Sequence, residues 1–305
     1  MGARTPRRGW LEGAPTPALP RKRGRGQKDN AECEPMPEGP EIRRAADRLA
    51  EAVVGRTLVS AWFAFPALGR HAKTLPGRRI LAIEPHGKAL LTRFDHGWTL
   101  YSHNQLYGVW KVCDAGERPD TTRSLRVALE TAERAILLYS ASDVAMWRDE
   151  DLAGHPFLSR LGPDVLDPRL DAATVEARLQ DSRFARRTLD ALLLDQGFLA
   201  GMGNYLRAEV LFEAGIAPGR RPVDLAADER ARLARALLDI PRHSYRSRGI
   251  APARGMRRDY LTDTPDGFRF HVFDRAGEPC TCCGAPIARS TSAGRRMYAC
   301  PRCQR

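Results

Sequence analysis

The sequence predicts an α+β protein in which an N-terminal helix and a two-layer β-sandwich precede a helical region and a short cysteine-rich hairpin. Apolar residues recur at helical spacing between residues 42 and 53, and they alternate in short runs from residue 57 to about 140. Beyond residue 168 they return to helical spacing. Two Cys-x-x-Cys pairs follow near the C-terminus.

The composition is that of a globular protein with an excess of positive charge. The chain has 305 residues, of which 43% are hydrophobic and 28% charged, and no apolar run reaches the length of a membrane span. Lys and Arg number 49 against 37 Asp and Glu, for a formal net charge of +12. Such an excess favours a polyanionic partner, although it also occurs in proteins that only need solubility.

Residues 1–35 differ from the rest. They contain five prolines, a basic RKRGRG run and no hydrophobic periodicity, so we expect a disordered extension that does not belong to the native protein. Eight Lys and Arg against four Asp and Glu lie in this segment. Residues 36–305 therefore keep a net charge of +8, and the basic character belongs to the part that folds.

An N-terminal domain is predicted for residues 36–155. It begins with an amphipathic helix that has Pro40 in its first turn and Gly55 as its stop. Antiparallel strands follow, enough for a two-layer β-sandwich or a barrel. The alternating runs are TLVSAWFAF (57–65), RRILAIEP (78–85), KALLTRFD (88–95), WTLYSH (98–103), RSLRVALE (123–130) and RAILLYS (134–140).

A helical domain is predicted for residues 156–265. Its periodic segments are DAATVEARLQ (171–180), RRTLDALLLD (186–195), NYLRAEVLFEAG (204–215) and DERARLARALLDI (228–240). The stretch 245–265 is rich in Arg, Gly and Pro, and we interpret it as a linker in preference to a functional loop that covers a substrate.

Residues 266–305 are predicted to form a zinc finger. Two Cys-x-x-Cys pairs are separated by sixteen residues, a spacing that suits one structural Zn²⁺ held by four thiolates. The four predicted ligands are Cys280, Cys283, Cys300 and Cys303. Cys282 is an alternative ligand with poorer spacing. Cys33 and Cys113 are left over, and isolated cysteines are usually small packing residues.

Six segments, in order, resemble the formamidopyrimidine-DNA glycosylase family and its endonuclease VIII branch. They are MPEGPEIRRAADRL (36–49), GKALL (87–91), YSHNQLYGVW (101–110), HPFLSRLGPDVLDP (155–168), LLLDQGFLAGMGNYLRAE (192–209) and the cysteine hairpin. The resemblance runs from Met36 to the C-terminus. It implies a helix-two-turn-helix motif at 192–209.

The resemblance implies catalysis by an N-terminal proline. In the family the initiator methionine is removed and the proline amine attacks C1′ of the damaged nucleoside; here these residues are Met36 and Pro37. An internal proline could not act in this way, because its nitrogen is a tertiary amide. We therefore expect Met36 to be the working start. The alternative is a genuine extension that is later cleaved, or that is retained in a DNA-binding protein without activity.

Three further catalytic residues are implied. Glu38 matches the family's general acid, although Pro37 and Glu38 alone are also typical of a helix start. Lys88 matches the lysine that contacts phosphate and assists β-elimination, although a lysine that opens a strand is usually a solvated edge residue. Arg295 matches the arginine of δ-elimination, and counting back from Cys300 selects it over its neighbour.

Five residues are expected to contact DNA. Gln105, Leu106 and Tyr107 match the loop that fills the gap left by an extruded base, although Leu106 and Tyr107 alone would also suit a core. Arg160 and Asn204 match contacts to the DNA backbone, the second at the start of a helix after Gly-Met-Gly. None of the seven histidines is assigned a role.

The predicted function is a base-excision-repair DNA glycosylase with AP-lyase activity (β,δ-elimination) on oxidised pyrimidines. The alternatives are a glycosylase for oxidised purines and a non-catalytic zinc-ribbon protein that binds DNA. The expected partner is damaged double-stranded DNA, with no membrane and no nucleotide cofactor. We expect a monomer in the cytoplasm, associated with the nucleoid.

Overall fold

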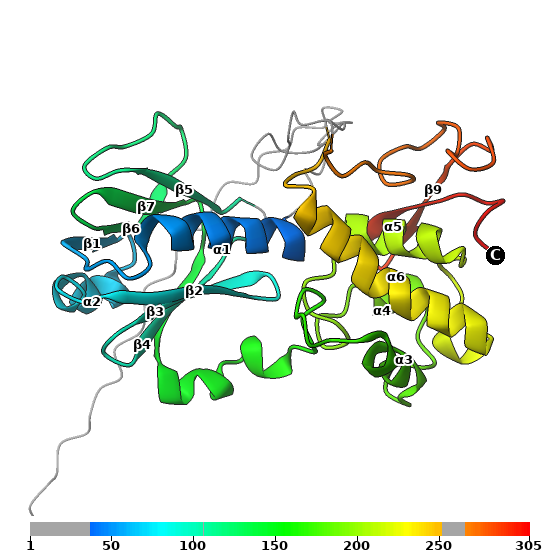
Figure 1. The fold of residues 1–305 in the computed structure, drawn as a ribbon, viewed down its shortest axis with the longest axis horizontal. Coiled ribbons are helices and arrows are strands. Elements are labelled where there is room, and N and C mark those ends of the chain that lie inside the picture. Colours follow the sequence, from blue (N-terminus) through cyan, green and yellow to red (C-terminus); the bar gives the residue numbers. More distant parts are fainter. Residues whose placement is uncertain (1–36, 106, 252–265) are drawn as a thin grey trace, which may run out of the picture. The chain divides into compact units, whose positions relative to one another are not determined.

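The computed structural model describes residues 37–105, 107–251 and 266–305. All of them fall within one unit of the chain, residues 33–305. The predicted order of a helix, antiparallel strands, further helices and a terminal hairpin is confirmed (Figure 1). None of the helices in these ranges is long and apolar enough to cross a membrane.

Helix α1 (Gly39–Val53) forms where the apolar spacing predicts it. Pro40 lies in the first turn, where its missing N–H leaves no hydrogen bond unmade. Gly55 follows the last turn with a φ of +79°, a conformation that glycine adopts without strain. The face that is buried in the β-sandwich carries Ile42, Ala46, Leu49 and Val53.

Two antiparallel four-stranded sheets follow. The first has the order β1-β6-β7-β5, with bounds β1 (Ser60–Phe63), β6 (Leu125–Glu130), β7 (Arg134–Tyr139) and β5 (Val109–Asp114). The second has the order β2-β3-β4-β8, with bounds β2 (Ile80–His86), β3 (Ala89–Phe94), β4 (Trp98–His103) and β8 (Asp143–Arg148). Side chains from both sheets and from α1 share one core, because α1 contacts β2 of one sheet and β5 and β7 of the other (Figure 1).

Two strands and one short helix are not among the segments that the sequence singled out. Strand β8 is partly buried along almost its whole length, so it shows no alternation of buried and exposed residues. Strand β5 follows directly on the NQLY segment, whose polar residues interrupt the pattern. The short helix α2 (Gly69–Thr74) follows a 3-10 turn, η1 (Pro66–Leu68), after β1.

The helical region contains four α-helices among the described residues: α3 (Ala172–Gln180), α4 (Leu189–Leu192), α5 (Asn204–Ala214) and α6 (Ala227–Arg246). Three short 3-10 turns accompany them: η2 (Asp149–Gly154), η3 (Leu158–Arg160) and η4 (Pro222–Asp224). Helix α4 is a single turn, shorter than the predicted segment. Helix α6 is longer than predicted and includes Pro241. Part of the expected linker, residues 252–265, lies outside the described residues.

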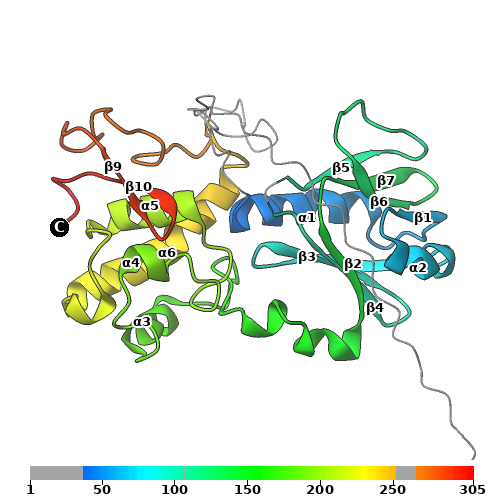
Figure 2. The same ribbon diagram turned by 180° about the vertical axis from the view of Figure 1, so that it is seen from behind.

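The terminal hairpin consists of β9 (Ala288–Ser292) and β10 (Arg295–Ala299) and packs on α5 (Figure 2). Strand β10 and helix α5 contribute to the second large core, in which Met297 and Tyr298 join Leu206 and Val210. The buried carboxylate of Glu209 on α5 strengthens this junction, because it accepts hydrogen bonds from three consecutive backbone N–H groups at residues 271–273. The hairpin and the helices therefore form one packed body.

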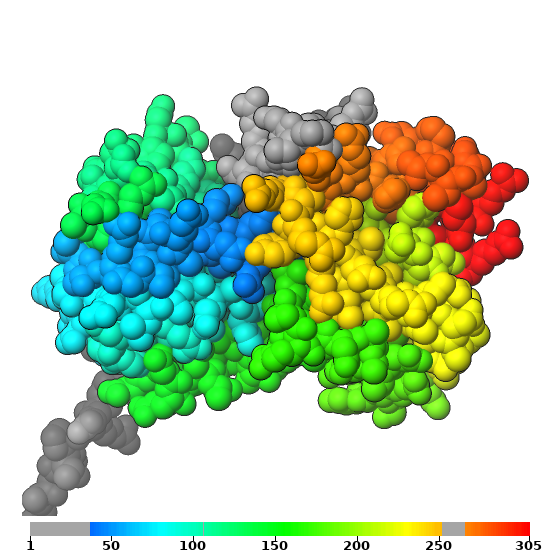
Figure 3. Space-filling model, in the orientation of Figure 1, coloured from blue at the N-terminus to red at the C-terminus, as the bar shows by residue number. Residues whose placement is uncertain are grey.

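Helix α1 also contacts α6, so it connects the two cores (Figure 3). Arg44 donates a hydrogen bond to the carbonyl oxygen of Ser244 at 2.6 Å and pairs with Glu41 at 2.8 Å. The Tyr205 hydroxyl of α5 lies within 3.0 Å of both Glu41 Oε1 and Ser244 Oγ. These buried polar groups satisfy one another, which orients the start of α1 relative to α5 and α6.

Candidate active site

A pocket of about 180 Å³ brings together residues from distant parts of the sequence. Its walls come from the segment before α1, the turn between β2 and β3, the end of β4 with the following loop, the segment before α5 and the start of β10. The lining residues are Pro37, Lys88, His103, Asn104, Gln105, Phe157, Leu194, Gln196 and Arg295. Four residues that the sequence selected therefore share one pocket.

Glu38 lies directly behind Pro37 and is buried, with 2% of its surface exposed. Its backbone N–H donates to Glu41 Oε2 at 2.9 Å, which orders the start of α1. Its carboxylate turns away from α1 and accepts hydrogen bonds from the backbone N–H groups of Tyr205 and Leu206, at 2.9 and 3.2 Å. Free N–H groups at the start of a helix favour an acceptor, so α5 holds this carboxyl beside the pocket.

The Gly-Met-Gly sequence before α5 makes this approach possible. A Cβ atom on Gly203 would lie 2.2 Å from the carboxyl carbon of Glu38. Gly201 has a φ of +92°, and its carbonyl oxygen accepts a hydrogen bond of 2.8 Å from the N–H of Gly39. Only residues without side chains allow the chain before α5 to lie against the start of α1 in this way.

Burial shifts the pKa of two groups at the pocket in opposite directions. Desolvation raises the pKa of Glu38 to about 7, a shift that the positive charge of Lys88 and the two N–H groups partly oppose. Desolvation lowers the pKa of the Lys88 ammonium, with Glu38 acting against the shift and Arg295 adding to it. A carboxyl group that is partly protonated near neutral pH, next to a lysine that gives up its proton more readily than usual, is suited to acid–base chemistry.

Tight turns position Lys88 and Arg295. Lys88 follows Gly87, which has a φ of +59° and whose N–H donates to Asp164 Oδ2 at 2.8 Å. Arg295 is the first residue of β10 and follows a two-residue turn in which Ala293 and Gly294 both have positive φ, as a type I′ hairpin requires. Each side chain thus enters the pocket from the end of a hairpin.

Gln105 enters the pocket from a strained turn. It has a φ of +49°, its N–H donates to His103 Nδ1 at 3.0 Å, and its Oε1 accepts from the Ser142 hydroxyl at 2.7 Å. The turn closes at Gly108, where a Cβ atom would lie 2.5 Å from the carbonyl oxygen of Asn104. Non-glycine residues at positive φ persist only where the surroundings hold them, which is typical of functional loops.

The structure does not place all of the predicted DNA-contacting residues at the pocket. Tyr107 is 64% exposed, on the same turn as Gln105. Arg160 is exposed at the end of η3, where its Nε donates to the Pro156 carbonyl oxygen. Asn204 begins α5 and donates to the carbonyl oxygen of Arg296 at 3.0 Å, so it supports the hairpin. Leu106 lies outside the described residues.

Five pocket residues were not selected from the sequence: His103, Asn104, Phe157, Leu194 and Gln196. Their position in the sequence could have identified them, because each of the five lies within one of the six segments that resemble the family. His103 is the clearest omission. Its Nδ1 accepts the Gln105 N–H, so a neutral ring carries its proton on Nε2, and burial lowers the pKa of the ring.

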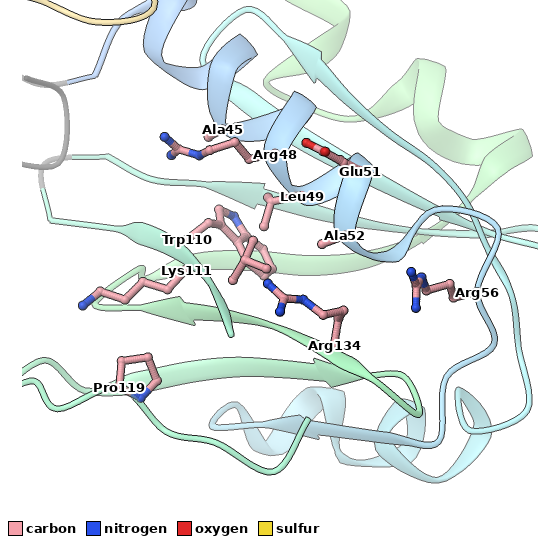
Figure 4. Close-up of a pocket in the computed structure, with 11 residues that line it drawn as sticks. Ala45, Arg48, Leu49, Glu51, Ala52, Arg56, Trp110, Lys111, Pro119 and Arg134 are labelled. Carbon is pink, nitrogen blue, oxygen red and sulfur yellow. The ribbon is translucent and has the colours of Figure 1, made fainter. Parts of the chain in front are cut away.

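A larger groove of about 770 Å³ lies between α1 and the β5-containing sheet (Figure 4). Its walls contain arginine, lysine and apolar residues, with Glu51 as the one carboxylate. It shares no lining residue with the pocket that contains Pro37. The smaller pocket is therefore the candidate active site.

The four predicted cysteine ligands meet in space. Their sulfur atoms all lie within 4.8 Å of one another, with 3.8 Å between Cys280 and Cys303 and 3.5 Å between Cys283 and Cys300. Four sulfurs at the usual Zn–S distance of about 2.3 Å from one ion would be separated by roughly 3.8 Å, so this donor set fits a tetrahedral metal. Cys282 is exposed and is not among the four cysteines of this cluster.

Two family models match the chain. The formamidopyrimidine-DNA glycosylase N-terminal domain matches residues 36–142, and the H2TH domain of formamidopyrimidine-DNA glycosylase matches residues 161–251. Among curated proteins, endonuclease 8 of Enterobacter sp. (strain 638) is 54% identical over 270 residues, which cover 88% of this chain and 100% of that protein. Endonuclease 8 of Escherichia coli O17:K52:H18 is 53% identical over 269 residues, with the same coverage.

Solved structures share the fold at low sequence identity. A complex between the Lactococcus lactis Fpg and an abasic site containing DNA has a TM-score of 0.75 and 22% identity, and the match covers 88% of this chain and 99% of that one. A structure of MutM in complex with carbocyclic 8-oxo-G containing DNA has a TM-score of 0.75 and 21% identity, and covers 88% and 100%.

Proposed function

The chain belongs to the formamidopyrimidine-DNA glycosylase family, with endonuclease 8 enzymes among its relatives, and from this premise we propose that it excises oxidised pyrimidines from duplex DNA through the amine of Pro37. As a member it is a DNA glycosylase and AP lyase of base excision repair. The observation that carries the proposal is the shared pocket of Pro37, Lys88 and Arg295, with the Glu38 carboxyl anchored directly behind it.

The first step is an attack of the free Pro37 nitrogen on C1′ of the damaged nucleoside. The new C1′–N bond replaces the bond to the base, and the base leaves with its bonding electrons. Opening of the sugar ring then gives an iminium ion between Pro37 and C1′. A free amine is required, because the electron pair of an amide nitrogen is delocalised into the carbonyl group.

Glu38 supplies the proton for base release. Its raised pKa keeps a substantial fraction of the group protonated near neutral pH, and its backbone neighbours on α5 hold it within reach of the sugar. Lys88 and Arg295 line the same pocket and offer positive charge there. Burial lowers the pKa of the Lys88 ammonium, so this group can also give up a proton. We assign them to the β- and δ-elimination steps, in which the 3′ and 5′ phosphates leave.

Gln105 and Tyr107 are assigned to the space that the extruded base leaves. Gln105 and the exposed Tyr107 stand on a turn beside the pocket, where a base would leave the stack. Unstacking a base costs a few kcal/mol, so side chains that replace it lower the energy of the extruded state. Arg160 and Asn204 are assigned to the DNA backbone.

Zn²⁺ is the proposed occupant of the four-cysteine cluster. The ion would be held by Cys280, Cys283, Cys300 and Cys303, and it would supply structural cross-linking of the hairpin that carries Arg295. The close approach of the sulfurs supports a tetrahedral thiolate site.

Met36 is the proposed initiator. The first family model begins at residue 36, and the curated relatives match in full over about 270 residues of this chain. A start at Met36 leaves Pro37 as the first residue after methionine removal, which the chemistry requires.

Borohydride trapping tests the mechanism. Two proteins are prepared, one beginning at Pro37 and one retaining residues 1–36, with each N-terminus verified by mass spectrometry. Each is incubated with a duplex that contains one AP site and is then reduced. We expect a covalent DNA adduct with the Pro37-start protein and none with the longer protein or with Pro37-start protein acetylated at its α-amine. Trapping or strand cleavage by the verified longer protein would overturn the proposal.

Defined duplexes test the substrate class. Single thymine glycol, 5-hydroxyuracil and 8-oxoguanine lesions are compared under single-turnover conditions. The proposal requires faster release of the two pyrimidines. Faster release of 8-oxoguanine would assign the chain to oxidised purines instead.

A further inference from the structure

The groove between α1 and β5 has a composition unlike that of the chain as a whole. Its walls come from the second half of α1, from β5, from the loop after β5 and from β7. Four lining residues are cationic, namely Arg48, Arg56, Lys111 and Arg134, and one is acidic. Residues 36–305 contain 41 Lys and Arg against 33 Asp and Glu, once the eight and four of residues 1–35 are set aside.

A second surface pocket shows that this enrichment is local. The pocket of about 490 Å³ along the other side of α1 is lined by three arginines against four carboxylates, so it has no excess of positive charge. The groove at β5 is therefore distinguished from its neighbour by unbalanced positive charge. This property favours an anionic occupant.

Two of the four cations have no ion-pair partner within the described part of the chain, namely Arg48 and Lys111. Figure 4 shows Arg48 on α1 and Lys111 on β5, and the Lys111 Nζ lies 6.0 Å from the centroid of the Tyr139 ring. Arg56 and Arg134 pair with Glu133 and Asp114, whose side chains are 72% and 62% exposed. Exposed ion pairs contribute little to stability, so a carboxylate of an incoming ligand can replace Glu133 or Asp114 at little cost.

The floor of the groove is apolar. Leu49 and Trp110 are buried there, and Ala52, Val112 and Pro119 are partly exposed. The indole N–H of Trp110 is buried and has no hydrogen-bond partner among the described residues. An occupant that has both carboxylates and apolar side chains would match this surface better than a phosphate chain would.

The groove also exposes the edge of a sheet. Strand β5 is the last strand of its sheet and pairs with β7 alone in the described chain. Three consecutive β5 residues, 110–112, line the groove. Successive residues of a strand point to opposite faces, so three in a row indicate that the groove meets the strand at its edge. An open edge offers backbone donors and acceptors to a further strand.

We propose that this groove docks an extended acidic peptide segment of a partner protein, which adds as a strand to the edge of β5. Its carboxylates would lie against Arg48 and Lys111, and its alternate apolar side chains would rest on the floor. The basic residues 1–35 of this chain have the wrong sign of charge for the site. This inference goes beyond the proposed function and does not depend on it.

The location leaves the active site free. Glu38 precedes the first residue of α1, and Arg48 follows ten residues later. At 1.5 Å per residue the two positions are separated by about 15 Å along the helix axis. A docked peptide would therefore hold the enzyme near a partner while the pocket with Pro37 works on DNA.

Fluorescence anisotropy tests the proposal with the chain that begins at Pro37. The probe is a fluorescein-labelled nonapeptide, Glu-Val-Glu-Leu-Glu-Val-Glu-Leu-Glu. We expect a dissociation constant on the order of 10 µM. The double variant Arg48→Glu, Lys111→Glu should weaken binding by about tenfold or more. The matched variant Arg232→Glu, Arg235→Glu, on the exposed face of α6, should leave binding unchanged. Both variants should retain cleavage of an AP-site duplex, which reports an intact fold.

Two further peptides and a competitor define the mode of binding. Replacing all five Glu residues of the probe by Lys should abolish binding. Replacing its Val and Leu residues by Pro should also abolish binding, because proline has no backbone N–H to donate. Equal binding of either peptide overturns the proposal. A 12-nucleotide DNA single strand is used as the competitor. If this strand displaces the probe and also binds the Arg48→Glu, Lys111→Glu variant more weakly, the groove binds DNA and the proposal is overturned. A dimer in sedimentation that the same variant dissociates would assign the groove to a second copy.

Discussion

Glu38 combines two properties that are uncommon in one carboxyl group. It accepts two backbone hydrogen bonds, which stabilise the charged form, and it is almost completely buried, which stabilises the neutral form. Burial has the larger effect, and the pKa rises to about 7. A group with this pKa can donate a proton near neutral pH while its position stays fixed.

Replacing Glu38 by Gln removes the proton donor and keeps the shape. We expect single-turnover release of thymine glycol to fall by about 10²–10⁴, the usual contribution of a general acid. Cleavage of a preformed AP site should change by less than about tenfold, because no base has to be expelled. Equal losses in both assays would contradict the assignment.

The pH dependence of base release follows from the same shift. The Pro37 amine, with a reference pKa of about 7.7–8.0, is largely free above pH 8, whereas Glu38 loses its proton as the pH rises above about 7. The rate of base release should therefore fall by about tenfold per pH unit above pH 8. The Glu38→Gln variant should show no such fall. A wild-type rate that stays level to pH 9.5 would count against Glu38 as the acid.

Gly203 should be as necessary as Glu38 itself. An added Cβ would overlap the Glu38 carboxyl at 2.2 Å, so Gly203→Ala must displace the acid or the start of α5. We expect base release to fall by at least about 10². Gly219→Ala is the control, since a Cβ at that position would contact nothing within 4 Å. Thermal melting of both variants separates this local effect from unfolding, and unchanged activity in Gly203→Ala would refute the geometry.

At the scale of elements, the turn after β4 connects the pocket to the DNA stack. It places Gln105 in the pocket at positive φ and leaves Tyr107 exposed, and Gly108 closes it against Asn104. The carbonyl oxygen of Tyr107 accepts a hydrogen bond of 2.8 Å from Arg123, which steadies the exposed end. The shape of the turn therefore depends on a few specific contacts.

Gly108→Ala tests whether the turn supports base extrusion. Its Cβ would lie within 2.6 Å of two backbone atoms of Asn104, so the turn must open. Release of a lesion from duplex DNA should fall by about tenfold or more, whereas release from a single strand should change little, because only the duplex needs the gap to be filled. Gly154→Ala, where a Cβ meets nothing, is the matched control. Equal losses on both substrates would argue for a general disturbance of the pocket.

At the scale of the whole molecule, two cores meet at α1. One contains α1 and the two sheets, and the other contains the helices and the cysteine hairpin. Cys280 and Cys300 belong to the second core, together with Met297 and Tyr298. A metal at the cysteines should therefore stabilise the second core and leave the first largely unaffected.

Metal removal tests whether the metal stabilises the second core and leaves the first unaffected. Chelation, or the substitution Cys303→Ser, should remove one equivalent of zinc and reduce strand cleavage by at least about tenfold, because Arg295 loses its fixed hairpin. Hydrogen exchange should increase in residues 204–214 and 286–305 and stay constant in the strands between residues 80 and 148. Cys113→Ser is the control, because Cys113 lies outside the cysteine cluster. Uniform loss of protection across both cores would show that they unfold together.

Much of the architecture could be read in the sequence because it depends on local patterns. The helix at residues 39–53, the strands between residues 57 and 140 other than β5, and the cysteine pairs each follow from short-range spacing. Strand β8 was not found, since partial burial along the strand removes the alternation on which such a prediction depends. The short α4 was overestimated, because apolar residues at helical spacing also suit a buried turn.

The sequence by itself determined the residue types available for chemistry: a proline after a methionine, a glutamate beside it, a lysine and an arginine at hairpin ends, and four cysteines. Only the tertiary structure decided that Glu38 turns to the start of α5, that burial raises its pKa, and that His103 and Gln196 complete the pocket. The physical reason is that pKa values and pockets depend on desolvation by neighbours far away in sequence, which no local pattern encodes.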